Sequence, residues 1–180
     1  QELAFDNYGN LFTGDNDCDH GDRERLVHIV EGGDSGWRIG YQFSEQNPAG
    51  AWNAEKLWHT RWQGQAAYLL PPLAHIDNGP SGFAFYPGIG LPEEFKDHFF
   101  LCHFKGQASV SGIKTFSLNP NGATFEMVND RILAWNILPT DVEFGPDGSL
   151  YWTDWVHGWP KSNMGRIYKL TPESGGNQAL

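Results

Sequence analysis

Apolar and polar positions follow the same order in two stretches of the chain, Leu3–Asp15 and Val142–Asp154. Each stretch begins with an apolar residue, a variable residue and Phe, and passes through a turn that ends in Gly and a polar residue. It then resumes with Leu and an aromatic residue and ends in Asp. Alternating apolar residues on both sides of a Gly-containing turn are typical of a β-hairpin. The pattern therefore predicts two equivalent hairpins, which start 139 residues apart.

A third, looser copy lies between them at residues 82–104. Its two predicted strands are separated by an insertion at residues 90–97, where Pro92–Asp97 is the best candidate for a short helix. Three copies indicate a repeat architecture rather than unrelated hairpins that share turn chemistry. Because propeller repeats contain about 40–50 residues, we interpret the offset between the first and last copies as about three blades.

The repeat and the composition together predict an all-β fold. Phe, Trp and Gly are abundant, charged residues make up only 19% of the 180 residues, and no long helical period is present. The length corresponds to one domain, residues 1–180, with about three to four β-propeller blades. The chain starts without Met inside a predicted strand. We therefore expect a fragment of a longer propeller, or a half that assembles with another chain. Open sheet edges of such a fragment favour self-association.

The net charge of −10 comes without any basic cluster, which argues against nucleic-acid binding and against adsorption to anionic membranes. No apolar run approaches the ~20 residues needed to span a bilayer, and no signal peptide is visible. The two cysteines, Cys18 and Cys102, form either a disulfide or two buried thiols. Lone cysteines in strands are more often buried packing residues.

The densest polar segment, residues 14–24, directly follows the first hairpin and carries five carboxylates. They belong to Asp15, Asp17, Asp19, Asp22 and Glu24. Oxygen ligands at alternating positions in a Gly-containing loop are what Ca²⁺ requires, and Asp17, Asp19 and Glu24 are the candidate ligands. The alternative is a solvated acidic loop with Asx turns. Five carboxylates this close together favour a cation or an arginine partner, and Arg23 and Arg25 are adjacent candidates.

Three further features offer binding chemistry. The Trp-rich segment 44–65 either lines a sugar-binding mouth or packs over a blade. Lys105 follows an apolar strand and is either an anion ligand at the central face of a propeller or a solvated strand end. Asp141, Asp154 and His157 offer a carboxylate–histidine pair, whereas the alternative is that Asp154 caps a turn, which its match to Asp15 favours.

The order of these segments resembles the soluble quinoprotein glucose/sorbosone dehydrogenases. These proteins are six-bladed β-propellers that use pyrroloquinoline quinone (PQQ) with calcium. The chain is especially similar to the large planctomycete-type membrane-bound dehydrogenases, which join such a propeller to helical repeats and a C-x-x-C-H haem domain. The resemblance covers essentially the whole chain but about half of a propeller. It rests on Leu3–Leu11, the acidic loop, Ile29–Trp37, Gly79–Gly82, Pro92–Phe100, Phe104–Lys105 and Asp141–Gly148.

Carried over by position, the resemblance implies a cofactor site. Asp19 and His20 stand where the family holds the calcium that touches the quinone, and Glu24 falls near a structural calcium ligand. Lys105 matches a lysine that contacts the quinone. Two arginines that bind the quinone carboxylates are replaced here by Leu138 and Thr140. The family's catalytic His lies upstream of this segment, so catalytic residues are not assigned in this chain.

The implied function is oxidation of a sugar or aldehyde hydroxyl, with hydride transfer to PQQ beside calcium, in the periplasm or outside the cell. The chain alone is not expected to be a competent dehydrogenase. The missing arginines favour a second hypothesis, a non-catalytic propeller that binds a carbohydrate or a protein. A third hypothesis is a calcium-dependent, lactonase-like hydrolase. The expected ligand is a sugar or another small polyol or aldehyde.

Overall fold

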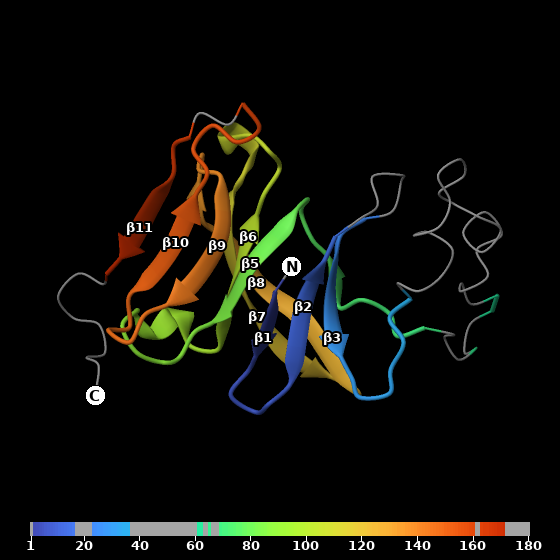
Figure 1. The fold of residues 1–180 in the computed structure, drawn as a ribbon. Coiled ribbons are helices and arrows are strands. Elements are labelled where there is room, and N and C mark those ends of the chain that lie inside the picture. Colours follow the sequence, from blue (N-terminus) through green and yellow to red (C-terminus); the bar gives the residue numbers. More distant parts are fainter. Residues whose placement is uncertain are drawn as a thin grey trace, which may run out of the picture.

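Three antiparallel β-sheets lie side by side in the computed structural model of the chain (Figure 1). The structure describes residues 2–16, 23–36, 61–62, 65, 69–160 and 163–171. These residues contain no α-helix, and their two 3-10 helices, η2 (Glu93–Phe95) and η3 (Ala108–Val110), lie in loops. No helix in this part of the chain is long and apolar enough to cross a membrane. The predicted all-β class is confirmed.

Each sheet is a meander in which strands pair in chain order. The first sheet contains β1 (Leu3–Phe5), β2 (Leu11–Asp15), β3 (Arg25–Ile29) and β4 (Ala74–His75). The middle sheet contains β5 (Pro80–Phe85), β6 (His98–His103), β7 (Gly112–Asn121) and β8 (Thr124–Trp135). The third sheet contains β9 (Pro139–Phe144), β10 (Leu150–Asp154) and β11 (Arg166–Leu170).

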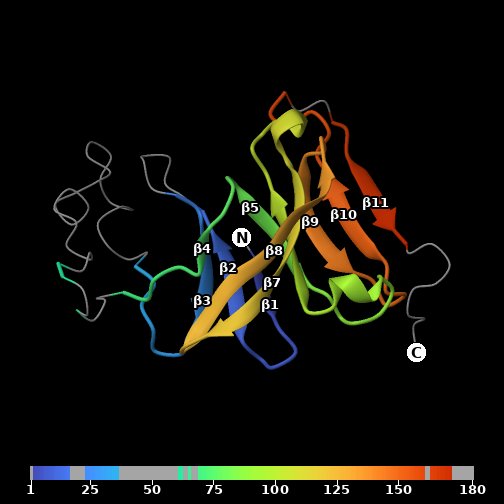
Figure 2. The ribbon, with the colours of Figure 1, turned by 180° about the vertical axis from the view of Figure 1, so that it is seen from behind.

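The first strands of the three sheets are neighbours. Strand β5 contacts β1 on one side and β9 on the other. The long strand β8, which ends the middle sheet, crosses in front when the molecule is seen from behind (Figure 2). Successive meanders whose first strands lie together are the arrangement of β-propeller blades. The described residues therefore form three blades, within the predicted three to four.

The predicted repeat is present residue by residue. Phe5 pairs with Leu11 across the first hairpin, and Phe144 pairs with Leu150 across the last. The turns carry Gly9 and Gly148 at positive φ, 84° and 74°, a conformation that glycine adopts readily. In the looser copy, Phe85 pairs with Phe99 on either side of the insertion that contains η2.

The predicted offset of about three blades between the first and last copies is wrong. The first copy opens the first sheet and the last copy opens the third, so 139 residues correspond to two blades. The blades are longer than the typical repeat because residues 30–73 connect β3 to β4 and residues 86–97 connect β5 to β6. Hairpin patterns locate the start of a blade, but they carry no information on the length of its loops.

The middle sheet buries both of its faces, so its strands are apolar at consecutive positions. Phe99 and Leu101 pack with Phe12 of the first sheet, whereas Phe100 and Cys102 pack with Leu150 of the third sheet. Side chains that alternate across a strand reach opposite faces, and a central sheet needs apolar residues on both. Strand β6 is accordingly buried at all six positions.

Cys102 lies in the second of these cores, fully buried, with a free thiol. Burial raises the pKa of this thiol far above its ordinary value. The buried-thiol interpretation therefore holds for Cys102. Its suggested partner, Cys18, lies outside the described residues.

Candidate functional site

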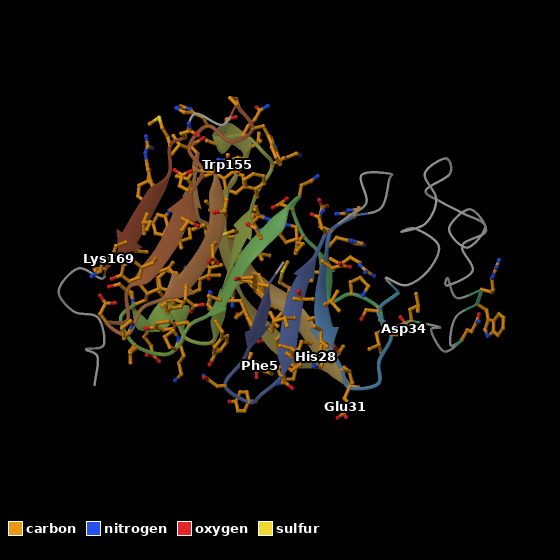
Figure 3. The ribbon with its side chains drawn as sticks, in the orientation of Figure 1. Phe5, His28, Glu31, Asp34, Trp155 and Lys169 are labelled. Atoms are coloured by element: carbon orange, nitrogen blue, oxygen red, sulfur yellow. The ribbon has the colours of Figure 1, made fainter. Side chains whose placement is uncertain are left out.

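Glu24, Lys105 and Asp154 lie in segments at one end of the three sheets, which we call the loop face. At this end β2, β4, β6, β8 and β10 finish and the following strands begin. Figure 3 shows Trp155 at this end, whereas Phe5 and Glu31 lie at the opposite end with the hairpin turns. The loop face brings together residues from all three blades, as a binding site at the mouth of a propeller requires.

Glu24 is the member of the predicted calcium site that the structure describes. Its side chain is 4% exposed, and Oε1 accepts a hydrogen bond of 3.3 Å from the backbone N–H of Gly79 at the start of the second blade. The other predicted residues, Asp17, Asp19 and His20, lie outside the described residues. Within the described ranges, no three His, Cys, Asp or Glu side chains are grouped to hold a metal. The calcium site remains a prediction.

Asp15 and Arg25 show what part of the acidic segment does. Arg25 forms an ion pair with Asp15, in which Nε donates to Oδ2 at 3.0 Å and the terminal guanidinium nitrogen donates to the same oxygen. Arg25 also donates a hydrogen bond of 2.8 Å to the backbone oxygen of Ser35. Arg25 is thus one of the two arginines predicted as partners of these carboxylates, and the ion pair fixes the start of β3 against the end of β2.

Lys105 lies on the loop face directly after β6, with its side chain exposed. Its backbone N–H donates to Oγ of Ser111 at 2.9 Å, and that hydroxyl donates to the backbone oxygen of Gln107 at 2.7 Å. These bonds hold the β6–β7 loop in a closed turn. The position suits an anion contact, and the role of Lys105 in such a contact remains a prediction.

A pocket of about 120 Å³ opens between β4 and the middle sheet, and the sequence did not indicate it. Lys114 bridges Asp77 at 2.5 Å and Asp130 at 3.2 Å within it. The hydrogen bond from Lys114 lowers the pKa of Asp77, and the charge of Lys105 adds to this effect. His103 donates from Nδ1 to the backbone oxygen of Asp77 at 3.1 Å, and burial lowers the pKa of His103. The polar groups of the pocket are thus largely satisfied by one another.

The two positions that the resemblance assigns to arginines serve the fold here. Leu138 is fully buried, and its backbone N–H donates to Oδ1 of Asp154 at 3.0 Å. Its backbone oxygen accepts a bond of 3.0 Å from the N–H of Trp155. Thr140 shares a hydrogen bond of 2.7 Å with the hydroxyl of Thr153 on the neighbouring strand. Neither side chain provides a cation for an anionic ligand.

Asp154 caps the turn after β10. Its Oδ1 accepts hydrogen bonds from the backbone N–H groups of Leu138, at 3.0 Å, and of Val156, at 2.9 Å, and the residue is 4% exposed. A buried carboxylate that accepts backbone donors stabilises the loop that supplies them. The capping interpretation of Asp154 therefore agrees with the geometry, and His157 lies exposed on the same turn.

An aromatic cluster stands on this turn, and we call its three members, Phe104, Trp155 and Trp159, the aromatic shelf. Phe104 and Trp155 are stacked with centroids 6.0 Å apart. Trp159 meets Trp155 edge to face at 5.0 Å and Phe104 at 6.5 Å. The sequence shows a run of aromatic residues at 152–159, but not that Phe104, about 50 positions earlier, joins it.

Two solved structures share the fold of this chain. A protein from Thermus thermophilus assigned as an oxidoreductase (glucose dehydrogenase) matches with a TM-score of 0.62 and 19% identity, over 94% of this chain and 44% of that chain. A glucose dehydrogenase structure matches with a TM-score of 0.61 and 18% identity, over 95% of this chain and 44% of that chain. Neither a family model nor a curated protein sequence matches the chain.

The chain thus spans less than half the length of the solved proteins it resembles. At this level of identity the likeness shows the fold, which is that of three β-propeller blades of the glucose dehydrogenase type. The sequence-based expectation of this fold is confirmed. The haem domain and the planctomycete-type subgroup remain expectations from the sequence.

Proposed function

We propose that this chain is part of a sugar-oxidising dehydrogenase of the β-propeller type, and that its loop face binds the sugar. The observation that carries the proposal is the meeting of three features at one end of a glucose dehydrogenase-type fold. These features are the buried carboxylate of Glu24, the exposed ammonium of Lys105 and the aromatic shelf. Aromatic surface beside a few fixed polar groups is the usual composition of a small-molecule site.

The described residues fit the implied cofactors unequally. For calcium, Glu24 offers a preorganised carboxylate, and Asp17 and Asp19 would supply further oxygen ligands. PQQ carries several carboxylates, which need cationic partners. Lys105 is an exposed cation of the loop face, but Leu138 is buried and apolar and Thr140 is bonded to Thr153. Leu138 and Thr140 thus supply no charge to a quinone, Lys105 is the position of these three that would, and we derive no step of the reaction through the cofactor.

The same two residues favour a second candidate function, a propeller that binds a carbohydrate without oxidising it. Leu138 supports the turn that carries Trp155 and Trp159, so this position contributes to a sugar-binding surface rather than to a cofactor clamp. In both functions the polar groups of the loop face would hold the hydroxyls of the sugar. The two functions differ in whether a redox cofactor binds beside it.

Calorimetric titration separates the two functions. The protein is titrated with PQQ in the presence of Ca²⁺, with Ca²⁺ alone and with glucose. The dehydrogenase proposal predicts PQQ binding that requires Ca²⁺ and is weakened in Lys105→Ala. Glucose binding without PQQ binding at high micromolar ligand would support the non-catalytic function. Absence of binding by both ligands would contradict both.

We also propose self-association through the open side of the first sheet. Leu3 is 59% exposed and Phe5 is 60% exposed, and Ile29 on the same face is 37% exposed. Exposed apolar side chains on one sheet face favour contact with another protein surface. Sedimentation velocity should show concentration-dependent association that Phe5→Ser weakens. A monomer at all concentrations would contradict this proposal.

A periplasmic or extracellular location is likewise proposed, and cell fractionation tests it.

A further inference from the structure

We propose that Trp159 provides the stacking surface for a pyranose ring on the loop face. This inference rests on the proposed sugar-binding function and adds the residue that contacts the ring. An indole offers an apolar face for the C–H groups of a sugar and an N–H donor for its hydroxyls.

The indole of Trp159 is both open and oriented. Trp159 is 65% exposed, although it contacts Trp155 at 5.0 Å with an interplanar angle of 73° and Phe104 at 6.5 Å with an angle of 85°. Its Nε1–H donates to no protein acceptor among the described residues. The side chain therefore presents apolar area and a hydrogen-bond donor to a ligand, while two edge-to-face ring contacts fix its orientation.

The β6–β7 loop leaves room for this indole. Gly106 has φ of 75°, and a Cβ at this position would come within 3.1 Å of Nε1 and 3.3 Å of Cδ1 of Trp159. A side chain at position 106 would therefore strain the backbone and crowd the indole. Lys105 lies between Phe104 and Gly106, both of which approach Trp159, so a charged donor is placed next to the aromatic surface.

The turn that carries Trp159 is held in a strained conformation. Val156 has φ of 54°, an unfavourable value for a β-branched residue. The capping carboxylate of Asp154 accepts the N–H of Val156 and offsets part of this strain. Strain of this kind persists where the surroundings over-determine it and is concentrated in ligand-binding segments. Trp159 is mostly exposed, so packing of its side chain does not offset the energetic cost of this backbone strain in the free protein.

Variants at position 159 test the inference. Glucose and maltose are titrated into the protein by calorimetry, and binding is compared in Trp159→Ala and Trp159→Phe. Loss of a stacking indole is expected to weaken binding at least tenfold, about 1.4 kcal/mol. Trp159→Phe should retain part of the affinity, because it keeps a smaller aromatic face. Tyr8→Ala is the control, since Tyr8 is an exposed aromatic residue, 87% accessible, at the opposite end of the sheets.

The outcomes separate this inference from the function on which it rests. If the wild-type protein binds neither sugar, the proposed function fails and the inference fails with it. If the wild type binds and Trp159→Ala binds equally well, the inference alone is overturned. A loss in Trp62→Ala with none in Trp159→Ala would overturn it too, and would assign stacking to the Trp-rich segment. Circular dichroism checks that each variant is folded, and Trp159→Phe keeps the test valid if the alanine variant is not.

Discussion

The first and last hairpins have the same pattern and register, yet opposite faces of them are covered. In the third sheet, Val142 and Leu150 are buried against the middle sheet, and Phe144 packs beside them. The equivalent residues of the first sheet are Leu3, Leu11 and Phe5, and they lie on its open side. The first sheet packs through its other face, with Phe12 and Ala4. A blade of this repeat thus has two faces that can pack, and its place in the row decides which one is covered.

The two open faces also differ from each other. The face of the third sheet that points away from the middle sheet carries Glu143, Tyr151 and Lys169. In the first sheet, the positions equivalent to Glu143 and Tyr151 are Ala4 and Phe12, which lie on its packed face. Tyr151 donates to Asp147 at 3.1 Å, and Lys169 pairs with Asp147 at 2.7 Å. An open face with its own polar network is satisfied in water, whereas the apolar face of the first sheet is not. The comparison shows that the same strand pattern is adapted to two different surroundings.

The final Asp of each copy shows a similar difference on the loop face. Asp15 pairs with the side chain of Arg25, whereas Asp154 accepts backbone N–H groups of Leu138 and Val156. The role of Asp15 thus depends on its negative charge, whereas the role of Asp154 depends on an acceptor oxygen. The scaffold repeats, and the loop chemistry built on it does not.

The largest expected effect separates the two equivalent phenylalanines. Phe144→Ala should lower the free energy of unfolding by about 3 kcal/mol, because Phe144 packs on Phe100 at 5.2 Å and Tyr86 at 5.4 Å. Phe5→Ala, at an exposed site, should cost less than about 1 kcal/mol. Urea unfolding of both variants measures the difference. Equal losses at a concentration at which sedimentation velocity shows a monomer would mean that another part of the chain covers this face, and would contradict the assignment of the open face.

Asp154 should be sensitive to loss of its oxygen rather than of its charge. Asp154→Ala leaves two backbone donors without their acceptor and should cost about 2–3 kcal/mol. Asp154→Asn keeps an acceptor oxygen and should cost less than about 1 kcal/mol. Thermal unfolding of the two variants measures the two losses of stability. If the asparagine variant is as unstable as the alanine variant, the charge is essential and the capping interpretation is wrong.

Asp15 should show the reverse preference. Asp15→Asn keeps the shape of the side chain but removes the charge that faces the half-buried Arg25, and we expect a loss of about 1–2 kcal/mol. The same substitution at the equivalent Asp154 is the matched control. Unfolding at 1 M salt should reduce the difference between wild type and Asp15→Asn only modestly, since partly buried pairs are weakly screened. If Asp15→Asn lowers stability no more than Asp154→Asn does, the two carboxylates do not differ in their dependence on charge, and this prediction is wrong.

The smallest effect concerns Glu2, which lies where the first copy meets the last. Its Oε2 accepts the N–H of Phe83 at 2.9 Å. Its pKa is raised, first by partial burial and then by the charges of Asp141 and Glu143. A carboxyl whose folded pKa lies above its unfolded value of 4.5 stabilises the fold below pH 4.5, and this stability is lost as pH rises through the raised pKa.

Replacement of this carboxyl tests that sign. Glu2→Gln should therefore increase stability at pH 7 by a few tenths of a kcal/mol at most, after solvent screening. The gain should disappear below pH 4.5. Unfolding of wild type and variant between pH 4 and pH 8 measures it. A variant that is less stable than wild type at pH 7 would show that the bond to Phe83 outweighs the repulsion.

The hairpins could be predicted from the sequence because their signal is local. Turn residues such as Gly9 and Gly148 and the alternation around them determine register without reference to the rest of the chain. The number of residues per blade could not be predicted, since the insertions within blades carry no periodicity. The core of the middle sheet was visible as the apolar run Phe99–Cys102, but the run does not say which residue faces which neighbour.

The candidate site was only partly predictable for the same reason. Lys105 and Glu24 were found from residue type and position, and both lie at the loop face. The aromatic shelf depends on contact between Phe104 and Trp159, which are brought together by packing of two blades. The different roles of Asp15 and Asp154 depend on whether an arginine side chain or a backbone turn lies within reach, and the repeat pattern is identical in both cases.

The most direct test of the loop face as a sugar site is a titration of the ¹⁵N-labelled protein with glucose, followed by backbone and indole amide resonances. The proposed function predicts that shifts concentrate at Gly79, Lys105, Gly106 and the Trp155–Trp159 turn, with the largest shift at the indole N–H of Trp159. The hairpin-turn amides of Tyr8 and Gly148, at the opposite end, should stay unchanged. Shifts confined to those turns, or none at saturating glucose, would contradict the claim.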